Sequence, residues 1–184
     1  VPGRNVISVG TATALWETPL MTGPARRIGD GAVSALAANS RSVLSANGDV
    51  IRLQRGEGQD NTITESLRVG GTVGAAAWDA REQHWWVATD SSLIRVTQNS
   101  NGLAATSRLP IPGGARGLAV GANYVAVVLG DAGVVAFPRA SLYSAQGGGV
   151  ITPLRVVGEP RFAFDADFVG DTLYVAGGVD GVFR

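Results

Sequence analysis

Short apolar segments that alternate with turn residues recur along the whole chain. The segment at 172–184 (TLYVAGGVDGVFR) contains an apolar stretch, a turn of Gly and Asp, and a second apolar stretch. Related segments lie at 5–17, 42–55, 84–96 and 124–137, and the starts of successive segments are 37, 42, 40 and 48 residues apart. The apolar residues alternate or form short blocks without a helical period, which predicts paired β-strands.

A stretch rich in Ala and Gly precedes each of the last four strand pairs, and a short further strand follows each pair except the last. A repeat of about 40–50 residues with this content is typical of a four-stranded propeller blade. Ala and Gly suit the innermost strand of a blade, because the blades converge there and leave little room for side chains. The predicted inner strands lie at 32–39, 72–79, 115–121 and 161–168, and the predicted outer strands at 25–29, 64–69, 106–111 and 152–157.

The repeats therefore predict an all-β fold, a β-propeller domain or segment built of four-stranded blades. Five blade units are expected, with 3, 4, 4, 4 and 3 strands in chain order. Because both terminal units are incomplete, we expect the chain to be a segment of a larger ring. The units cover approximately residues 1–30, 31–70, 71–112, 113–158 and 159–184.

Two of the five units carry a more specific pattern, in which a Val-Gly pair comes shortly before a Tyr-Val-Ala strand. They are LAVGANYVAVVLGDAGVVAFPRAS at 118–141 and ADFVGDTLYVAGGVDGVFR at 166–184. These units resemble the bacterial propeller repeats of the LVIVD and YVTN type, within the WD40-like superfamily. The first unit departs from that pattern after its third strand, at FPRAS. The resemblance implies a propeller fold, and such repeats occur in surface and periplasmic proteins.

The composition limits which functions this fold can serve. Hydrophobic residues make up 45% of the chain and charged residues 16%, as expected of a domain with its own core. The 15 basic residues are all Arg, a bias typical of high-GC bacterial coding, and they balance 15 acidic residues. No basic stripe for nucleic acid is therefore expected. No apolar run approaches the roughly 20 residues of a transmembrane segment, and the absence of Cys excludes disulfides and thiolate sites.

Candidate chemistry is sparse. The lone His84 removes most zinc sites and the usual Ser-His-Asp triad. Asp165, Asp167 and Asp171 lie within one short stretch, and such carboxylates could bind calcium. The alternative is a solvated cluster that caps a turn, and we expect no cofactor apart from this candidate calcium site.

Three further charged residues have one structural and one functional interpretation each. Asp79 ends a predicted inner strand, where we expect an exposed turn residue; the alternative is that Asp79 and Asp167 serve acid/base chemistry or hold an ion at one end of the channel. Arg116 and Arg161 lie at the entry to two predicted inner strands, where we expect them to be solvated or stacked on a neighbour. Anion binding is the alternative for both arginines.

Four residues are candidates for an interface. Trp85 and Trp86 are adjacent in a predicted strand, so their side chains must point to opposite faces. We expect one indole in the core and the other exposed, and His84 at the surface. Val182 and Phe183 lie in a final strand whose outer neighbour is not visible, and we expect them to pair with a strand from outside this sequence.

Three functions remain open at this stage. The leading hypothesis is a non-catalytic interaction or scaffold propeller, periplasmic, secreted or at the cell surface, that binds a protein partner or the remainder of its ring. The second is a propeller enzyme of the lactonase, lyase or quinone-dehydrogenase kind, whose axial ligands would come mostly from other blades. The third is a structural subunit of a large assembly.

Overall fold

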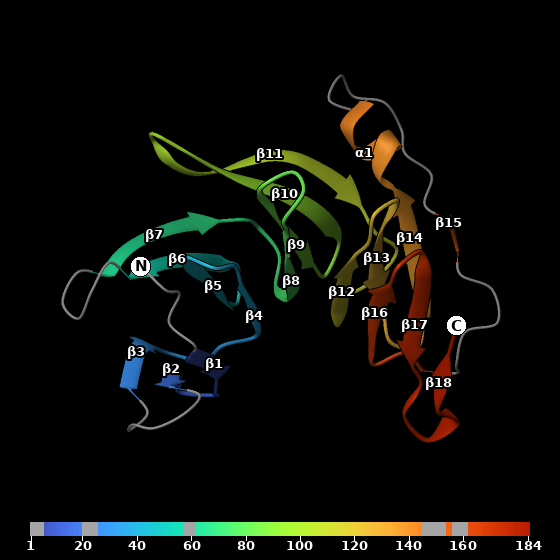
Figure 1. The fold of residues 1–184 in the computed structure, drawn as a ribbon, viewed down its shortest axis with the longest axis horizontal. Helices are drawn as coiled ribbons and strands as arrows, with labels where there is room; N and C mark the ends of the chain where they lie inside the picture. The colour runs from blue at the N-terminus through green and yellow to red at the C-terminus, as the bar shows by residue number, and fades with distance from the viewer. Residues whose placement is uncertain (1–5, 20–25, 57–61, 145–153, 156–161) are drawn as a thin grey trace.

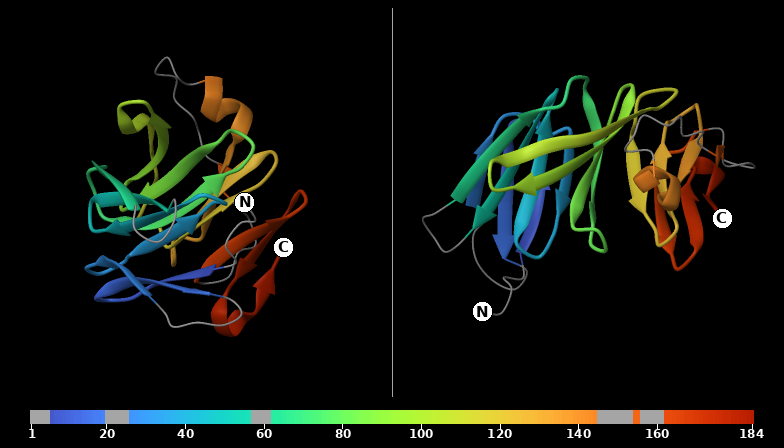
Figure 2. Two further views of the ribbon diagram at one scale, coloured as in Figure 1. Left: turned by 60° about the vertical axis from the view of Figure 1, so that its left-hand side comes forward. Right: turned by 90° about the horizontal axis from the view of Figure 1, so that it is seen from above.

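The computed structural model describes residues 6–19, 26–56, 62–144, 154–155 and 162–184. These residues form five antiparallel sheets that follow one another along an arc (Figure 1). Seen from above, the sheets stand side by side along the chain (Figure 2, right). The predicted all-β, propeller-type fold is confirmed.

Each sheet is a simple meander in which consecutive strands pair. The described strands are distributed 3, 4, 4, 4 and 3 over the sheets, as the repeats predicted. The first two sheets consist of β1 (Val6–Gly10), β2 (Ala14–Pro19), β3 (Arg26–Asp30), β4 (Ala35–Ala38), β5 (Ser42–Asn47), β6 (Val50–Gly56) and β7 (Thr62–Arg68). The third to fifth sheets consist of β8 (Val73–Asp79), β9 (His84–Thr89), β10 (Ser92–Asn99), β11 (Gly102–Pro110), β12 (Gly117–Val120), β13 (Tyr124–Val128), β14 (Val134–Pro138), β15 (Leu154–Arg155), β16 (Asp165–Val169), β17 (Thr172–Ala176) and β18 (Val182–Phe183).

Two short helical segments were not predicted. The helix α1 (Arg139–Ser144) directly follows β14, and the 3-10 helix η2 (Gly178–Asp180) connects β17 to β18. Neither is long enough to give the chain a helical period, so hydrophobic periodicity could not reveal them. None of the helices in the described part of the chain is long and apolar enough to span a membrane.

The innermost strands β4, β8, β12 and β16 contact one another in sequence along the inner side of the arc. Their small residues permit this close approach. A Cβ atom on Gly74 would lie 1.8 Å from the carbonyl oxygen of Ala115 in the neighbouring unit. A Cβ atom on Gly121 would lie 2.7 Å from the ring of Phe168. The predicted role of Ala and Gly in the inner strands is confirmed.

The hydrophobic core is divided into layers between adjacent sheets. Ile51, Leu53, Trp85 and Val87 belong to the layer between the second and third sheets. The layer between the third and fourth sheets contains Trp86, Leu93, Val125 and Phe137. The layer between the fourth and fifth sheets is built of smaller side chains, among them Ala119, Ala126, Val128, Ala166 and Val175. The third and fourth sheets are thus covered on both faces.

Candidate functional site

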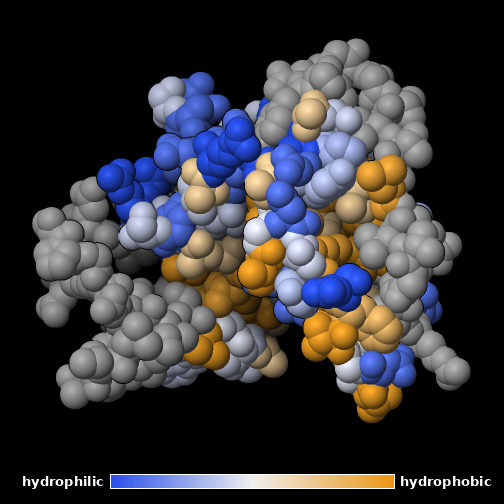
Figure 3. Space-filling model, turned by 45° about the vertical axis from the view of Figure 1, so that its right-hand side comes forward, coloured by the Kyte–Doolittle hydropathy of each residue, from blue (hydrophilic) through white to orange (hydrophobic). Residues whose placement is uncertain are grey.

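Exposed apolar side chains are concentrated on the last sheet. Of the seven large hydrophobic side chains exposed in the described residues, four belong to residues 162–184, and the others are Val9, Tyr124 and Leu154. The four are Phe164, Val169, Val179 and Val182, which are 56%, 67%, 105% and 71% exposed. Val169 lies at the turn between β16 and β17, whereas the other three lie at the opposite end of the sheet. We call Phe164, Val179 and Val182 the last-sheet patch. In Figure 3, where this side of the molecule comes forward, apolar surface lies among polar residues over the lower right.

The strand β18 forms one edge of the last sheet. Its Phe183 lies opposite Val175, and its Val182 lies opposite Ala176. Phe183 is half-buried against the core between the fourth and fifth sheets, whereas Val182 points to solvent. The two predicted interface residues therefore differ: Val182 is available to a partner, and Phe183 anchors the strand. Their pairing with an outside strand stays a prediction.

The three candidate calcium ligands lie near one another in sequence but have separate hydrogen bonds. Asp165 and Asp167 are both exposed, and their Oδ1 atoms accept the backbone N–H groups of the next residues at 2.9 and 2.8 Å. Asp171 Oδ1 accepts a bond from Asn123 Nδ2 at 3.0 Å. Among the described residues, no group of three or more acidic, His or Cys side chains is placed to hold a metal ion. Calcium binding stays an untested prediction.

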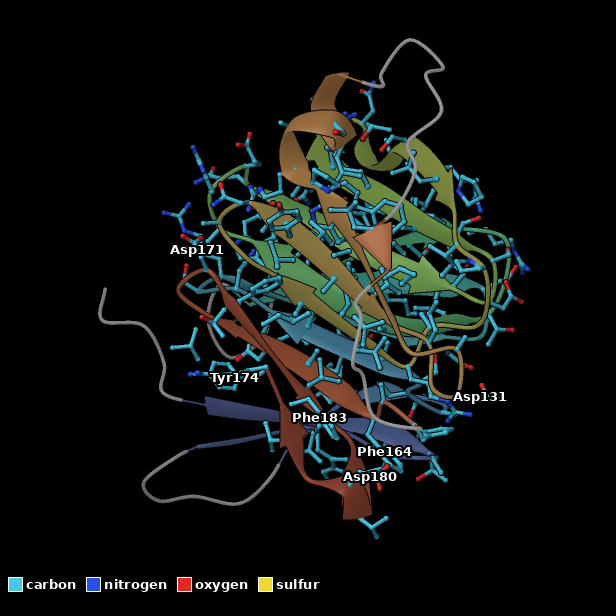
Figure 4. All side chains as sticks on the ribbon, turned by 90° about the vertical axis from the view of Figure 1, so that its right-hand side faces the viewer. Asp131, Phe164, Asp171, Tyr174, Asp180 and Phe183 are labelled. Carbon is cyan, nitrogen blue, oxygen red and sulfur yellow. The ribbon has the colours of Figure 1, made fainter. Side chains whose placement is uncertain are left out.

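Arg116 and two aromatic residues form a stack between the fourth and fifth sheets. The guanidinium carbon of Arg116 lies 5.1 Å from the centre of the Phe162 ring, and the Phe162 and Phe164 rings are 4.7 Å apart. Figure 4 shows Phe164 at the same end of the last sheet as Asp180. The expected stacking of Arg116 on a neighbour is confirmed. Arg161 lies outside the described residues.

Trp85 and Trp86 point to opposite faces of β9, as predicted, but neither is exposed. Trp85 is 2% exposed and contacts Trp78, with ring centres 4.6 Å apart. Trp86 is fully buried on the other face. The expectation of one exposed interface indole is wrong, because β9 lies in a middle sheet and neighbouring sheets cover both of its faces.

A buried ion pair connects the third and fourth sheets, and the sequence did not predict it. Asp79 ends β8 and is 1% exposed, so the expectation of an exposed turn residue is wrong. Arg139, at the start of α1, places its Nη2 atom 2.9 Å from Asp79 Oδ1 and 2.8 Å from Oδ2. Its Nη1 atom donates to the carbonyl oxygen of Gly121 at 2.8 Å. Arg139 covers the turn in which Asp79 lies, which explains the burial.

Asp79 is also held by its own sheet. The backbone N–H groups of Arg81 and Glu82 donate to Asp79 Oδ1 at 3.1 and 3.2 Å. The Trp86 indole N–H donates to Oδ2 at 3.4 Å. The carboxylate thus receives donors from the third sheet and from α1, which follows the fourth sheet, and the cluster acts as a clamp between the two units.

His84 belongs to the same buried cluster, so the expectation of a surface histidine is also wrong. Its Nε2 atom lies 3.8 Å from Asp79 Oδ2, and its ring meets Trp86 edge to face at 4.9 Å. Burial lowers the pKa of His84, and the nearby Asp79 carboxylate opposes this effect only in part. The side chain is therefore neutral at pH 7 and is shielded from substrates in solution.

A cavity of about 260 Å³ lies between the first and second sheets. Its lining is mostly polar and includes Asp30, Ser45, Asn47, Arg52 and Gln54. Typical small-molecule pockets have volumes of about 300–1,000 Å³ and mostly apolar walls. The size and the lining of this cavity therefore give no support to a ligand site.

Comparison with known proteins supports the fold alone. No protein-family model matches the chain, and no curated protein matches it. Among solved structures, a chain of Kuenenia stuttgartiensis hydrazine synthase, a β-propeller-containing protein, superposes with a TM-score of 0.69 at 11% sequence identity. The match covers 95% of this chain and 55% of that one, so the chain spans about half the length of its neighbour. At this identity the likeness carries no information on activity.

Proposed function

We propose that this chain belongs to a non-catalytic interaction propeller of the LVIVD or YVTN-repeat type that binds a protein partner through its last sheet. The observation that carries the proposal is the last-sheet patch beside the edge strand β18. Exposed apolar side chains gathered in one place mark interaction surfaces more often than chance would. An extracytoplasmic bacterial location is part of the proposal, because such repeats occur in periplasmic and surface proteins.

The edge strand offers a specific way to bind. In the described residues, β18 pairs only with β17, so its second edge presents backbone N–H and C=O groups to any strand that approaches. A partner strand added here would form main-chain hydrogen bonds. The exposed Val182 and Val179 would then contribute apolar contacts beside the new strand. Gly181, at φ +90°, leads the chain into β18 and contains no side chain that would block this approach.

The position of the only histidine supports binding over catalysis. His84 lies within the clamp of Asp79 and Arg139, away from solvent, where it has no access to a substrate. Hydrazine synthase is an enzyme by name, but its 11% identity with this chain supports no transfer of activity. We therefore favour the interaction propeller over the propeller enzyme.

Cross-linking in the cells that make the protein tests this proposal. A photoreactive phenylalanine analogue replaces Val182 in one variant and Leu154 in the control variant. Leu154 is 51% exposed and lies on the fourth sheet, so the two probes have similar access to solvent. We expect illumination to link position 182, but not position 154, to one defined protein, identified by mass spectrometry. If both folded variants give the same products, or neither gives any, the proposal is wrong.

A further inference from the structure

The clamp around Asp79 places two basic side chains beside one buried carboxylate oxygen. Arg139 Nη2 lies 2.8 Å from Asp79 Oδ2, and His84 Nε2 lies 3.8 Å from the same oxygen. The Trp86 indole N–H also donates to that oxygen, at 3.4 Å. All four side chains are buried, so water screens their charges little. While His84 is neutral, one buried cation faces one buried anion and the two charges balance.

Several elements around the imidazole of His84 contribute charged groups. Asp79 ends β8 and carries a negative charge that favours a proton on the ring. Arg95 of β10 and Arg139 of α1 carry positive charges that oppose it. In the turn between β8 and β9, the Glu82 backbone hydrogen-bonds the ring, and the 41% exposed Glu82 side chain places its Oε1 atom 3.8 Å from Arg139 Nη2. A proton on the ring therefore adds a third cation beside one buried and one partly exposed carboxylate.

The added charge acts on the contact between the third and fourth units. An unbalanced buried charge is unfavourable, so the protonated cluster is relieved when one cation moves into water. His84 lies in β9, which pairs with β8 and β10, and it cannot leave unless the third sheet opens. Arg139 instead begins the six-residue helix α1, which lies beyond the end of β14 (Figure 1). Arg139 is therefore the cation that can withdraw while the strands stay paired.

We propose that the clamp is an acid-sensitive joint: a proton on His84 displaces Arg139 from Asp79 and releases α1 from the third sheet. In the closed clamp, burial lowers the pKa of His84, so the neutral ring is favoured. Withdrawal of Arg139 removes a neighbouring cation and uncovers the ring, which brings its pKa back toward the ordinary value of about 6.5. The open form therefore takes up a proton more readily, and its population rises as the pH falls below about 6.5.

The second sheet contains the same kind of turn without a titratable group. Asn39 Oδ1 accepts the backbone N–H groups of Arg41 and Ser42, both at 2.8 Å. Asp79 Oδ1 accepts two backbone N–H groups of its own turn in the same way, at 3.1 and 3.2 Å. The Asn39 amide is uncharged, and Arg41 stays protonated at every pH of interest. The turn of the second sheet is therefore an internal control for the turn of the third.

Amide hydrogen exchange, followed residue by residue by NMR at pH 7.5 and 5.5, tests the joint. The Arg139 N–H donates to the Asn123 carbonyl oxygen at 2.9 Å, so its exchange reports the release of α1. The Asn39 N–H donates to the Ser42 carbonyl oxygen at 3.0 Å and is the matched control. Each rate is divided by the intrinsic rate at that pH. One proton taken up at an ordinary histidine pKa raises the open population by at most about tenfold over this range. We expect a rise of up to that size for Arg139 and none for Asn39.

Two variants separate a joint from a general loosening in acid. His84→Gln replaces the imidazole by a polar group that does not titrate, and it should abolish the rise at the Arg139 amide. Asp79→Asn keeps a turn cap of the kind that Asn39 forms but removes the anion that holds Arg139, so exchange should be fast already at pH 7.5.

Four results would overturn the inference. The first is no rise at the Arg139 amide, or an equal rise at the Asn39 amide. The second is a rise that persists in His84→Gln. The third is slow exchange of the Arg139 amide in folded Asp79→Asn at both pH values. The fourth is an equal rise along β13 and β14, because the whole fourth sheet would then open instead of the joint.

Discussion

Replacing Arg139 by Met tests whether the buried clamp holds the third and fourth sheets together. Met has a similar length and is apolar, so it fills much of the same space. The substitution removes the charge that lies 2.8 Å from Asp79 Oδ2 and the donor to the Gly121 carbonyl oxygen. Both ionic side chains are nearly inaccessible, at 7% exposed for Arg139 and 1% for Asp79. Solvent therefore cannot replace the lost cation.

Removing one partner of a buried ion pair costs about 3–5 kcal/mol, because an uncompensated charge stays in the interior. The lower end of this range applies here. Asp79 keeps two backbone N–H donors, from Arg81 and Glu82, and the weaker indole donor of Trp86. We therefore expect Arg139→Met to lower the free energy of unfolding by about 3 kcal/mol. A loss of this size is a large part of the total stability of a domain.

Urea unfolding followed by tryptophan fluorescence measures the effect. The matched control is Arg68→Met, which breaks an ion pair with Asp49 at 2.9 Å whose side chains are 76% and 38% exposed. Exposed pairs contribute at most about 1 kcal/mol, so the control should change little. If Arg139→Met and Arg68→Met destabilise the chain equally, the clamp contributes no more than a surface pair and the reasoning is refuted.

Two further predictions concern the same region. Burial lowers the pKa of His84 in the folded chain below the value of about 6.5 that it has in the unfolded chain. The unfolded chain therefore takes up a proton more readily, so the free energy of unfolding is fully present above about pH 6.5 and decreases as the pH falls below it. The melting temperature should therefore fall between about pH 7.5 and 5.5, and His84→Gln should reduce that fall; an unchanged pH profile would count against this role. Gly74→Ala should destabilise by about 1–3 kcal/mol, because its Cβ atom would meet the Ala115 carbonyl oxygen at 1.8 Å. Gly113→Ala is the control in the same thermal unfolding assay, since a Cβ there has no heavy atom within 4 Å, and equal losses would contradict the packing argument.

The strands were predictable because each depends on a local pattern. The predicted inner strand at 72–79 corresponds to β8 (Val73–Asp79), and the predicted pair at 84–96 corresponds to β9 and most of β10. The alternation of apolar and polar residues, and the turn residues that end each strand, are local features of a few neighbouring positions. Both can be seen in a single sequence. Repetition then strengthened each assignment, because the same strand order had to fit five times.

The burial of Asp79 was not predictable in the same way. Its partner Arg139 lies 60 residues further along the chain, in a different unit. No spacing rule connects the two residues. In the sequence, the segment FPRAS, which contains Arg139, stood out only because it differs from the repeat pattern of the family that the unit resembles. A turn position suggested exposure for Asp79, whereas a neighbouring sheet covers it. The two indoles were misjudged for a related reason: alternation gives the direction of a side chain but not whether a sheet covers that side.

Asp165 and Asp167 lie between these two cases. Alternation alone placed both residues on one side of a strand, opposite Ala166. Ala166 packs on the fourth sheet, as that pattern predicts. A Cβ atom on Gly117 of the fourth sheet would nevertheless lie 2.8 Å from Asp165 Oδ1, so this carboxylate reaches toward the fourth sheet as well. Alternation gives the side on which a side chain leaves the strand, whereas the position of its last atoms depends on the neighbouring sheet, which a single sequence does not display.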